Sequence, residues 1–315
     1  MQHIVQLFIG SELARYGFGV GHPFGPDRMD AFWQEVLRQG LHKKVSIAAP
    51  VLADREAINR FHTPEYINRV MERSESGDGY LDYGDTPAFK GVYEAAATVV
   101  GTVLAAAEEA INGSHQRCFI PIAGLHHARR NMAAGFCVFN DAGVLIETLR
   151  SQYGIQRIAY ADIDAHHGDG VFYAFEADPD LCIVDIHEDG AHLYPGTGFA
   201  NETGICAAKE TKLNLPLRSG ANDADFVRVW PEAEGFIRAF KPEFIIFQCG
   251  ADSIAGDPIT DMGFTPKAHA HAAASLCRVA DEFCKGRLIG LGGGGYNRDN
   301  LANGWCAVLS AFVDC

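Results

Sequence analysis

The chain has 315 residues, of which 48% are hydrophobic and 21% are charged, and its formal net charge is −14. This is an ordinary globular composition, long enough for one large α/β domain or two small ones. The acidic balance excludes the basic footprint of a nucleic-acid-binding protein, so we expect no nucleic-acid partner. The negative charge is explained either by a role in solubility or by attraction of cationic substrates, and total charge does not distinguish these two explanations.

Hydropathy and cysteine usage indicate the cellular compartment in which the protein is expected. No apolar stretch approaches the length that spans a membrane, and the first apolar run, residues 4–9, is too short for a signal peptide. The nine cysteines include no C-x-x-C pair, and Cys182 and Cys249 lie within apolar runs. These are features of buried thiols in a reducing compartment. We expect a cytoplasmic protein with no membrane partner and no cysteine-based zinc site.

Short apolar runs alternate with helical patterns along the chain. In chain order the patterns predict a strand at 4–9, a helix at 92–111 closed by Asn112-Gly113, strands at 118–122, 157–163 and 181–187, a helix at 223–240 kinked or split at Pro231, a strand at 244–250, a helix at 265–284 with Thr265 as N-cap and Pro266 as its first residue, and a strand at 287–293. The strand runs are almost continuously apolar, which is typical of parallel strands covered on both faces. We therefore predict an α/β fold with a doubly wound parallel sheet, in a single domain over residues 1–315.

Polar residues with useful chemistry follow five of these strands. They are His, Asp, Tyr or glycines, in the segments AGLHHA (123–128), DAHHGDG (164–170), EDGAHLYPGTG (188–198), GADS (250–253) and GGGGY (292–296). In open parallel sheets, ligands bind at the carboxyl ends of the strands. The five segments should therefore meet in one site.

The segment Asp162-Ile163-Asp164-Ala165-His166 predicts a metal site. Residues two apart on a strand share a face, so the two aspartates and the histidine can point the same way. Asp164 and His166 would supply two ligands of a catalytic zinc, which usually has three from the protein. The third is Asp252, whose carboxylate follows a buried strand and is costly there unless it is coordinated. A solvated strand end and a helix N-cap at Asp252 are the plainer alternatives.

The adjacent histidines His126 and His127 predict acid–base chemistry. Amide hydrolysis needs a base that takes a proton from water and an acid that protonates the leaving amine. Each histidine would need a carboxylate on its far nitrogen, and Asp162 and Asp169 are the natural candidates. Tyr296, just beyond four glycines, could donate to the oxyanion that develops on the carbonyl. The glycines lack the Lys-Ser/Thr that a P-loop requires.

Six motifs together resemble the zinc-dependent histone deacetylase superfamily, which includes bacterial acetoin-utilisation-type deacetylases and acetylpolyamine amidohydrolases. They are AGLHHA, GFCVFNDAG, DIDAHHGDGV, YPGTG, QCGADSIAGDP and LGGGGY, in the family's order, and the resemblance runs from residue 16 to the C-terminus. It implies an arginase-like α/β fold with an eight-stranded, mainly parallel sheet flanked by helices.

The resemblance also implies roles for individual residues. It places the metal on Asp164, His166 and Asp252, and it makes His127 the main general base and acid, His126 an electrostatic partner, Asp162 and Asp169 their supports and Tyr296 the carbonyl-polarising group. It implies a substrate tunnel and its rim at Asp85, Gly135, Phe136, Tyr194, Ile259 and Gly294, and an internal cavity behind the metal at Arg28. Ile259 stands where lysine deacetylases carry an aliphatic residue, whereas polyamine-selective relatives can carry glutamate.

The same resemblance implies structural potassium ions. The first site would use Asp162, Asp164, His166, Asp185 and Ile186, and a second would lie around Phe175, Asp178 and Leu181. Asp185 departs from the family, which often has serine at this position. The extra carboxylate could strengthen potassium binding or alter the electronics of the metal, and the sequence leaves both alternatives open. The 187–192 loop also departs from many relatives, which leaves the shape of the rim open.

We expect a deacylase that uses Zn²⁺, with Fe²⁺ as an alternative at a site of one histidine and two carboxylates. The leading substrate is acyl-lysine in a protein or peptide, and the alternative is an acylated small amine such as an acetylpolyamine. A non-catalytic acyl-lysine reader should have lost a ligand or the tyrosine. An arginase-like manganese hydrolase would need more bridging aspartates and has no use for paired histidines. The sequence leaves the oligomeric state open, including a homo-oligomer, and the small-amine alternative predicts an enclosed entrance or a dimer that restricts access.

Overall fold

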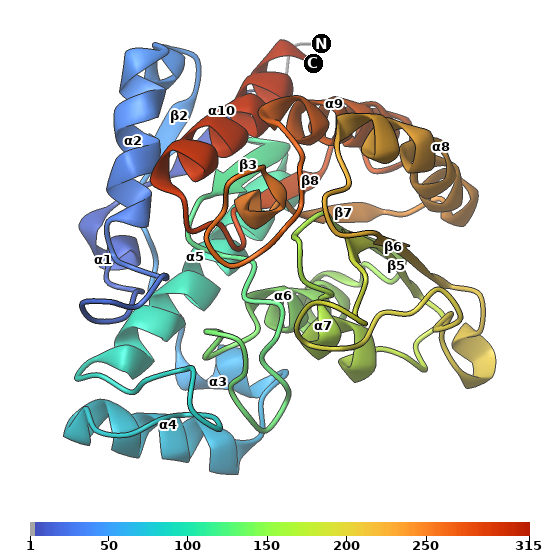
Figure 1. The fold of residues 1–315 in the computed structure, drawn as a ribbon. Helices are drawn as coiled ribbons and strands as arrows, with labels where there is room; N and C mark the ends of the chain where they lie inside the picture. Colours follow the sequence, from blue (N-terminus) through green and yellow to red (C-terminus); the bar gives the residue numbers. More distant parts are fainter. Residues whose placement is uncertain (1–3) are drawn as a thin grey trace.

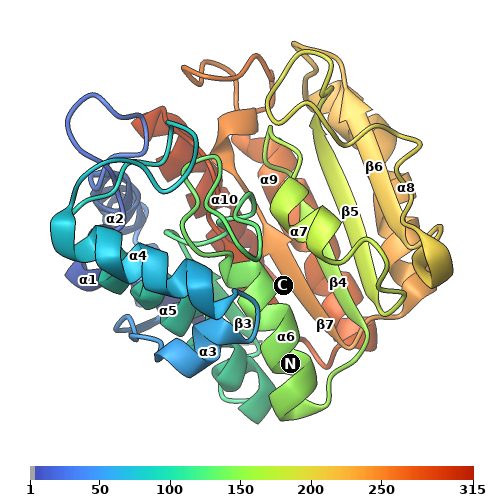
Figure 2. The same cartoon turned by 90° about the horizontal axis from the view of Figure 1, so that it is seen from below.

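A single eight-stranded sheet forms the centre of the computed structural model, which describes residues 4–315 (Figures 1 and 2). Its strand order is β2-β1-β3-β8-β7-β4-β5-β6, and every neighbouring pair is parallel. The strands are β1 (Val5–Phe8), β2 (Ser46–Ala48), β3 (Arg117–Ile120), β4 (Ile158–Asp162), β5 (Leu181–Glu188), β6 (Lys212–Leu217), β7 (Phe244–Gln248) and β8 (Leu288–Leu291). The predicted α/β class is confirmed, and the sheet is wholly rather than mainly parallel.

All six strands predicted from apolar runs are present, and they include the four at the centre of the sheet. The two missed strands, β2 and β6, are its edges. Each edge strand has partly exposed residues, so neither forms a continuous apolar run. The sequence signal of a parallel strand depends on burial of both faces, and edge strands lack that burial.

Helices cover both faces of the sheet. They are α1 (Ser11–Ala14), α2 (Arg28–Arg38), α3 (Arg55–Asn59), α4 (Pro64–Ser76), α5 (Val92–Asn112), α6 (Asp141–Tyr153), α7 (Asp169–Ala174), α8 (Asp223–Phe240), α9 (Pro266–Phe283) and α10 (Arg298–Asp314), with short 3₁₀ turns at Leu41–Lys43, Cys206–Ala208 and Ala251–Ser253. Figure 1 shows α8, α9 and α10 above the sheet and α5, α6 and α7 below it. The described part of the chain has no helix long and apolar enough to cross a membrane.

The three helices predicted from the sequence are confirmed. Helix α9 begins at Pro266, and the Thr265 side chain accepts a hydrogen bond from the Lys267 N–H as its N-cap. Helix α8 runs through Pro231 without a break. An Asn222 capping box begins this helix, and four apolar residues of it, including Phe226 and Trp230, are buried. This burial holds the helix together across the hydrogen bond that proline cannot make.

Candidate active site

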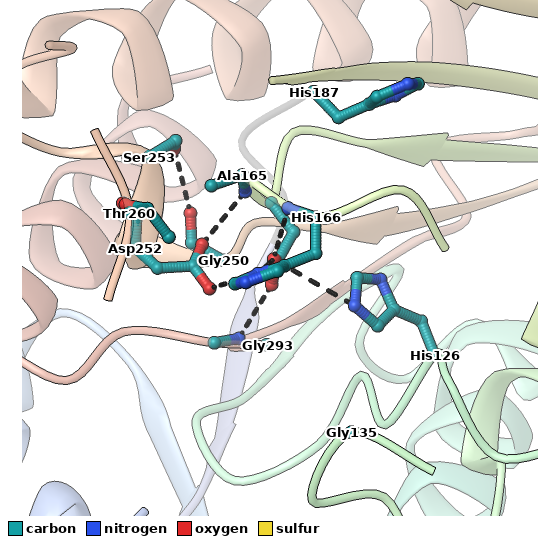
Figure 3. Close-up of polar contacts among 12 residues, drawn as sticks. His126, Gly135, Ala165, His166, His187, Gly250, Asp252, Ser253, Thr260 and Gly293 are labelled. Atoms are coloured by element: carbon teal, nitrogen blue, oxygen red, sulfur yellow. Dashed lines mark hydrogen bonds and ion pairs between the residues drawn. The ribbon is translucent and has the colours of Figure 1, made fainter. Parts of the chain in front are cut away.

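Asp164, His166 and Asp252 bring their ligand atoms together, all within 4.8 Å of one another. His166 Nδ1 lies 3.1 Å from Asp164 Oδ1 and 3.2 Å from Asp252 Oδ2. All three residues are buried, and Asp252 has no exposed surface. Figure 3 shows Asp252 beside His166, with His126 on the other side of that ring. Two buried carboxylates facing one imidazole fit a divalent cation of the zinc or iron(II) type.

Backbone N–H groups hold these carboxylates in position. The Asp164 N–H donates to Asp162 Oδ1, and the His166 N–H donates to Asp164 Oδ1, each at 3.0 Å. These side-chain turns follow directly from the D-x-D-x-H spacing at the end of β4. The Ala165 N–H donates to Asp252 Oδ1 at 2.9 Å, which leaves Asp252 Oδ2 facing the cluster.

The electrostatics of the cluster favour a bound cation. Burial and the nearby charge of Asp164 raise the pKa of Asp252 to about 7. Burial acts on Asp164 in the same direction, but the charges of His126 and His166 and the hydrogen bond from His166 hold its pKa well below the usual range. The two imidazoles compensate Asp164, but the raised pKa of Asp252 shows that its charge is not fully compensated, and a divalent ion would supply more positive charge.

The two histidines form separate dyads with the expected aspartates. His126 Nδ1 lies 2.9 Å from Asp162 Oδ2, and His127 Nδ1 lies 2.7 Å from Asp169 Oδ1. The Nε2 atoms of the two rings approach to 3.0 Å. Tyr160 completes the support of the first dyad, since its hydroxyl donates to Asp162 Oδ2 at 2.7 Å.

The surroundings give the two histidines opposite charge states. Burial lowers the pKa of His126, but the carboxylates of Asp162 and Asp164 outweigh burial and raise it to about 10. Burial and the neighbouring charge of His126 lower the pKa of His127 to about 4. A protonated His126 then donates through Nε2 to a neutral His127, which keeps its proton on Nδ1 toward Asp169. The opposite directions of these two pKa shifts favour His127 as the base and His126 as its positively charged neighbour.

A cavity of about 300 Å³ leads to these groups. All six residues predicted for the tunnel and its rim line it: Asp85, Gly135, Phe136, Tyr194, Ile259 and Gly294. The same cavity reaches His126, His127, Asp164, His166 and Tyr296. The remaining predicted groups, Asp162, Asp169 and Asp252, support it from behind through the contacts described above. Tyr194 is 45% exposed and Ile259 is 37% exposed, so both lie toward the mouth.

Gly135 and Phe136 form one wall through an unusual backbone path. Their φ values are 52° and 66°, both in the left-handed region. A Cβ at Gly135 would lie 2.5 Å from His127 Cδ2, so glycine is required beside the base. The Tyr16 hydroxyl donates to the Phe136 carbonyl at 2.7 Å, and Thr86 Oγ1 accepts the Phe136 N–H at 3.1 Å. These two bonds hold the wall in its strained conformation.

Tyr296 lies opposite this wall, with its ring centroid 5.8 Å from that of Phe136. Burial, with the carboxylates of Asp252 and Asp164, raises the pKa of Tyr296 well above its usual value. The phenol therefore stays protonated and remains a hydrogen-bond donor. Asp257 was not singled out from the sequence, yet its carboxylate accepts the Tyr296 N–H at 2.7 Å and the Ile259 N–H at 3.1 Å. The available signal in the sequence was its position in the Gly-Asp-Pro segment at residues 256–258.

Gln248 is a second group that the sequence did not identify. Its Nε2 donates to Asp164 Oδ2 at 2.8 Å, and its Oε1 accepts the Gly250 N–H at 2.7 Å. It is the last residue of β7 and is fully buried. The sequence signal for Gln248 was a polar residue at the end of an otherwise apolar strand, because a buried amide needs hydrogen-bond partners.

Arg28 is buried against the glycine segment that follows β8, and the internal cavity expected around it stays a prediction. Its guanidinium donates to the carbonyls of Gly295 at 2.8 Å and Gly293 at 2.6 Å, and it stacks over the Phe24 ring at 3.9 Å. Its Nη1 is buried and has no hydrogen-bond partner among residues 4–315. Burial lowers the pKa of Arg28 to about 10, so the group remains charged at neutral pH.

The residues predicted for the first potassium site lie together at the ends of β4 and β5. Asp162 is opposite Asp185 in the sheet register, and Ile186 follows on β5. The unusual Asp185 carboxylate is already engaged, since it meets His187 Nδ1 at 2.7 Å and accepts the Gly168 N–H at 2.9 Å. Potassium at this place stays a prediction.

The comparisons with known proteins agree with this site. A family model described as the histone deacetylase domain matches residues 22–312. The chain belongs to the histone deacetylase family. It is 35% identical to the acetoin utilization protein AcuC of Bacillus subtilis, over 90% of this chain and 75% of that protein. It is 34% identical to histone deacetylase clr6 of Schizosaccharomyces pombe, over 96% of this chain and 75% of that protein.

The fold of a solved family member agrees as well. The crystal structure of the HDA15 HD domain superposes with a TM-score of 0.91 at 25% identity, and the match covers 99% of this chain and 90% of that one. The protein is therefore a metal-dependent amide hydrolase of the deacetylase family, and its Asp164, His166 and Asp252 form the metal site typical of zinc-dependent members.

A glycine at the metal site provides a first test. A Cβ at Gly294 would lie 2.0 Å from Asp252 Oδ2 and 2.9 Å from Asp164 Oδ2. Gly294→Ala is therefore expected to displace the carboxylates and weaken metal affinity by about 10- to 100-fold, with the fold retained. Competition with a fluorescent zinc chelator measures the affinity, and circular dichroism checks the fold.

Gly235→Ala is the matched control. This exposed glycine lies in α8, where an added Cβ meets nothing within 4 Å. We expect unchanged metal affinity and a gain in stability of about 0.5–1 kcal/mol from the better helix former. Equal metal affinity in both variants would contradict the geometry of the Gly294 contact.

Proposed function

We propose that the protein removes acetyl or related acyl groups from the ε-amine of lysine in proteins or peptides. The observation that carries this proposal is the tunnel, which runs from an exposed rim at Asp85 and Tyr194 to the buried cluster of histidines, carboxylates and Tyr296. A slender passage between Phe136 and Tyr194 suits an unbranched aliphatic chain with the amide at its inner end. The aliphatic Ile259 at the mouth supports lysine over polyamine.

The residues of the chain divide the chemistry among them. A divalent ion on Asp164, His166 and Asp252, which we propose to be zinc with iron(II) as the alternative, would polarise the acyl carbonyl and acidify a water molecule. With substrate bound, the attacking water takes the place of His126 as the partner of His127 Nε2. Neutral His127 then accepts the proton of that water on Nε2 and later delivers it to the leaving amine. Protonated His126 and the Tyr296 hydroxyl stabilise the negative charge that develops on the carbonyl oxygen.

The rim offers a feature suited to a peptide. Asp85 is held by the loop that Asp82 organises, since Asp82 Oδ1 accepts the N–H groups of Gly84, Asp85 and Thr86 at 2.9 to 3.1 Å. A carboxylate fixed at the mouth could accept the backbone N–H groups that flank an acyl-lysine. A small acylated amine has no such groups, and it is the second candidate substrate because the acidic rim also suits its cationic end.

A substrate panel tests the proposal. Acetyl-lysine peptides, acetylputrescine and acetylspermidine are compared for wild type and Asp85→Asn, with a chelator control in each case. We expect turnover of the peptides and loss of that turnover with chelator. In Asp85→Asn, KM for peptides should rise by about 10-fold or more, because the amide offers one acceptor oxygen where the carboxyl group offers two. Turnover of the acetylpolyamines alone would overturn the lysine assignment.

Three predictions about the whole protein stand beside this proposal. We propose that residues 1–315 act as one catalytic domain in the cytoplasm, with an acylated substrate as the principal partner and without nucleic acid or membrane. The nine cysteines support a reducing compartment, because all of them are free thiols.

A further inference from the structure

Lys212, at the start of β6, buries a positive charge among neutral oxygens. The residue is only 1% exposed. Its Nζ donates to the carbonyls of Asp178 at 2.8 Å and Leu181 at 2.6 Å, and to Thr211 Oγ1 at 2.8 Å. The three donors of the ammonium are therefore all used, and each partner is an uncharged oxygen.

A buried lysine is normally paired with a carboxylate, and this one is not. No carboxylate among residues 4–315 forms an ion pair with Lys212. The carboxylate with the largest charge effect on Lys212, that of Asp178, is paired with Arg150. A cation surrounded by carbonyl and hydroxyl oxygens has the coordination of a potassium ion in a protein. An ammonium group and a potassium ion are also of similar size.

Two of these three oxygens belong to residues that were assigned to the second potassium site. The resemblance to the deacetylases places that ion around Phe175, Asp178 and Leu181. The carbonyls of Asp178 and Leu181 already accept from Lys212, and the Phe175 carbonyl accepts the Asp178 N–H at 3.0 Å. A free potassium ion within reach of these carbonyls would meet the ammonium at close range, where like charges repel strongly in a buried setting. The residues present therefore do not fit a second potassium ion.

We propose that the Lys212 ammonium is a tethered cation that replaces the second monovalent ion of the fold. It joins the loop between α7 and β5 to the edge strand β6, whose Lys212 lies opposite Ile183 in the register. The covalent tether keeps the charge in place whatever the potassium concentration. This end of the sheet should therefore need no added ion, in contrast to a chain with a small residue at position 212.

The test replaces the tether and asks whether an ion can take its place. Lys212→Ser leaves space and a hydroxyl oxygen, whereas Lys212→Met removes the charge but fills the space. Lys209→Met is the matched control, because Lys209 is an exposed lysine of the same segment. Melting temperatures are measured in potassium chloride and in choline chloride at equal ionic strength, and the difference between the two salts is compared with that of wild type.

We expect Lys212→Ser to gain about 2–6 °C more from potassium than wild type does, because an ion that binds only the folded state stabilises it. Lys212→Met should be destabilised in both salts, and Lys209→Met should behave as wild type. Crystals soaked in rubidium should show an ion beside the carbonyls of Asp178 and Leu181 in Lys212→Ser and none there in wild type. A rubidium ion at these carbonyls in wild type, or a Lys212→Ser variant that gains no more from potassium than wild type, would overturn the proposal.

Discussion

Asp252→Ala is expected to abolish metal binding and turnover together. Among residues 4–315, the substitution leaves Asp164 and His166 as the two ligands of the buried cluster. Two ligands do not retain a catalytic zinc at ordinary free-metal levels. Without the ion the carbonyl is not polarised and water is not acidified, so activity should fall by more than about 10³-fold. Metal content by mass spectrometry and deacylation of an acetyl-lysine peptide measure the two losses.

Controls separate loss of the ligand from loss of the fold. Asp261→Ala removes an exposed carboxylate nine residues further along the same segment, and it should leave metal content and activity unchanged. Asp252→Asn keeps the volume of the side chain and an oxygen that can accept the Ala165 N–H, so it should fold but bind metal weakly. An Asp252→Ala protein that retains stoichiometric metal and full activity would refute the ligand assignment.

Tyr296→Phe is expected to keep the metal and the tunnel but to lose most of the turnover. The phenyl ring can retain its packing against Phe136 and Phe24, whose centroids lie 5.8 and 6.3 Å away. What is lost is one donor, which the raised pKa of Tyr296 keeps protonated at neutral pH. Removing one donor to a developing oxyanion typically lowers kcat by about 10² to 10³.

The measurement for Tyr296 is the split between kcat and KM at constant metal content. A loss confined to kcat indicates a group that acts in the transition state, whereas a rise in KM alone would indicate a wall of the tunnel. Tyr173→Phe is the control, since the Tyr173 hydroxyl donates to Glu202 outside the tunnel. Near-normal kcat in Tyr296→Phe would mean that another group polarises the carbonyl.

The strongest sequence signals were patterns of apolar residues, which burial makes periodic in helices and continuous in interior parallel strands. The runs that became β4, β5, β7 and β8 could be recognised because an interior parallel strand is covered on both faces and is therefore apolar on both. The edge strands β2 and β6 were not, and the count of eight strands came from the resemblance to the deacetylases rather than from the runs themselves. Pro231 illustrates the opposite error, since a local helix breaker was tolerated where packing holds the helix.

The site followed a similar rule. His126, His127, Asp164 and Tyr296 could be named because they occupy the ends of strands whose position the apolar runs predict, and parallel strands end at one edge. Gln248 and Asp257 had only weak local signals. Each acts through a hydrogen bond to a residue distant in sequence, Asp164 in one case and Tyr296 in the other. No spacing along the chain encodes such a contact.

The sequence by itself therefore determined the class of fold, the residues of the metal cluster and the pairing of two histidines with two aspartates. These depend on local periodicity and on ligand types that follow each strand. Only the tertiary structure decided which charges are compensated and how. It paired Asp185 with His187, divided the charge between His126 and His127, and placed Lys212 among carbonyls. The energy of a buried charge depends on every group packed around it, and those groups come from segments that only the fold brings together.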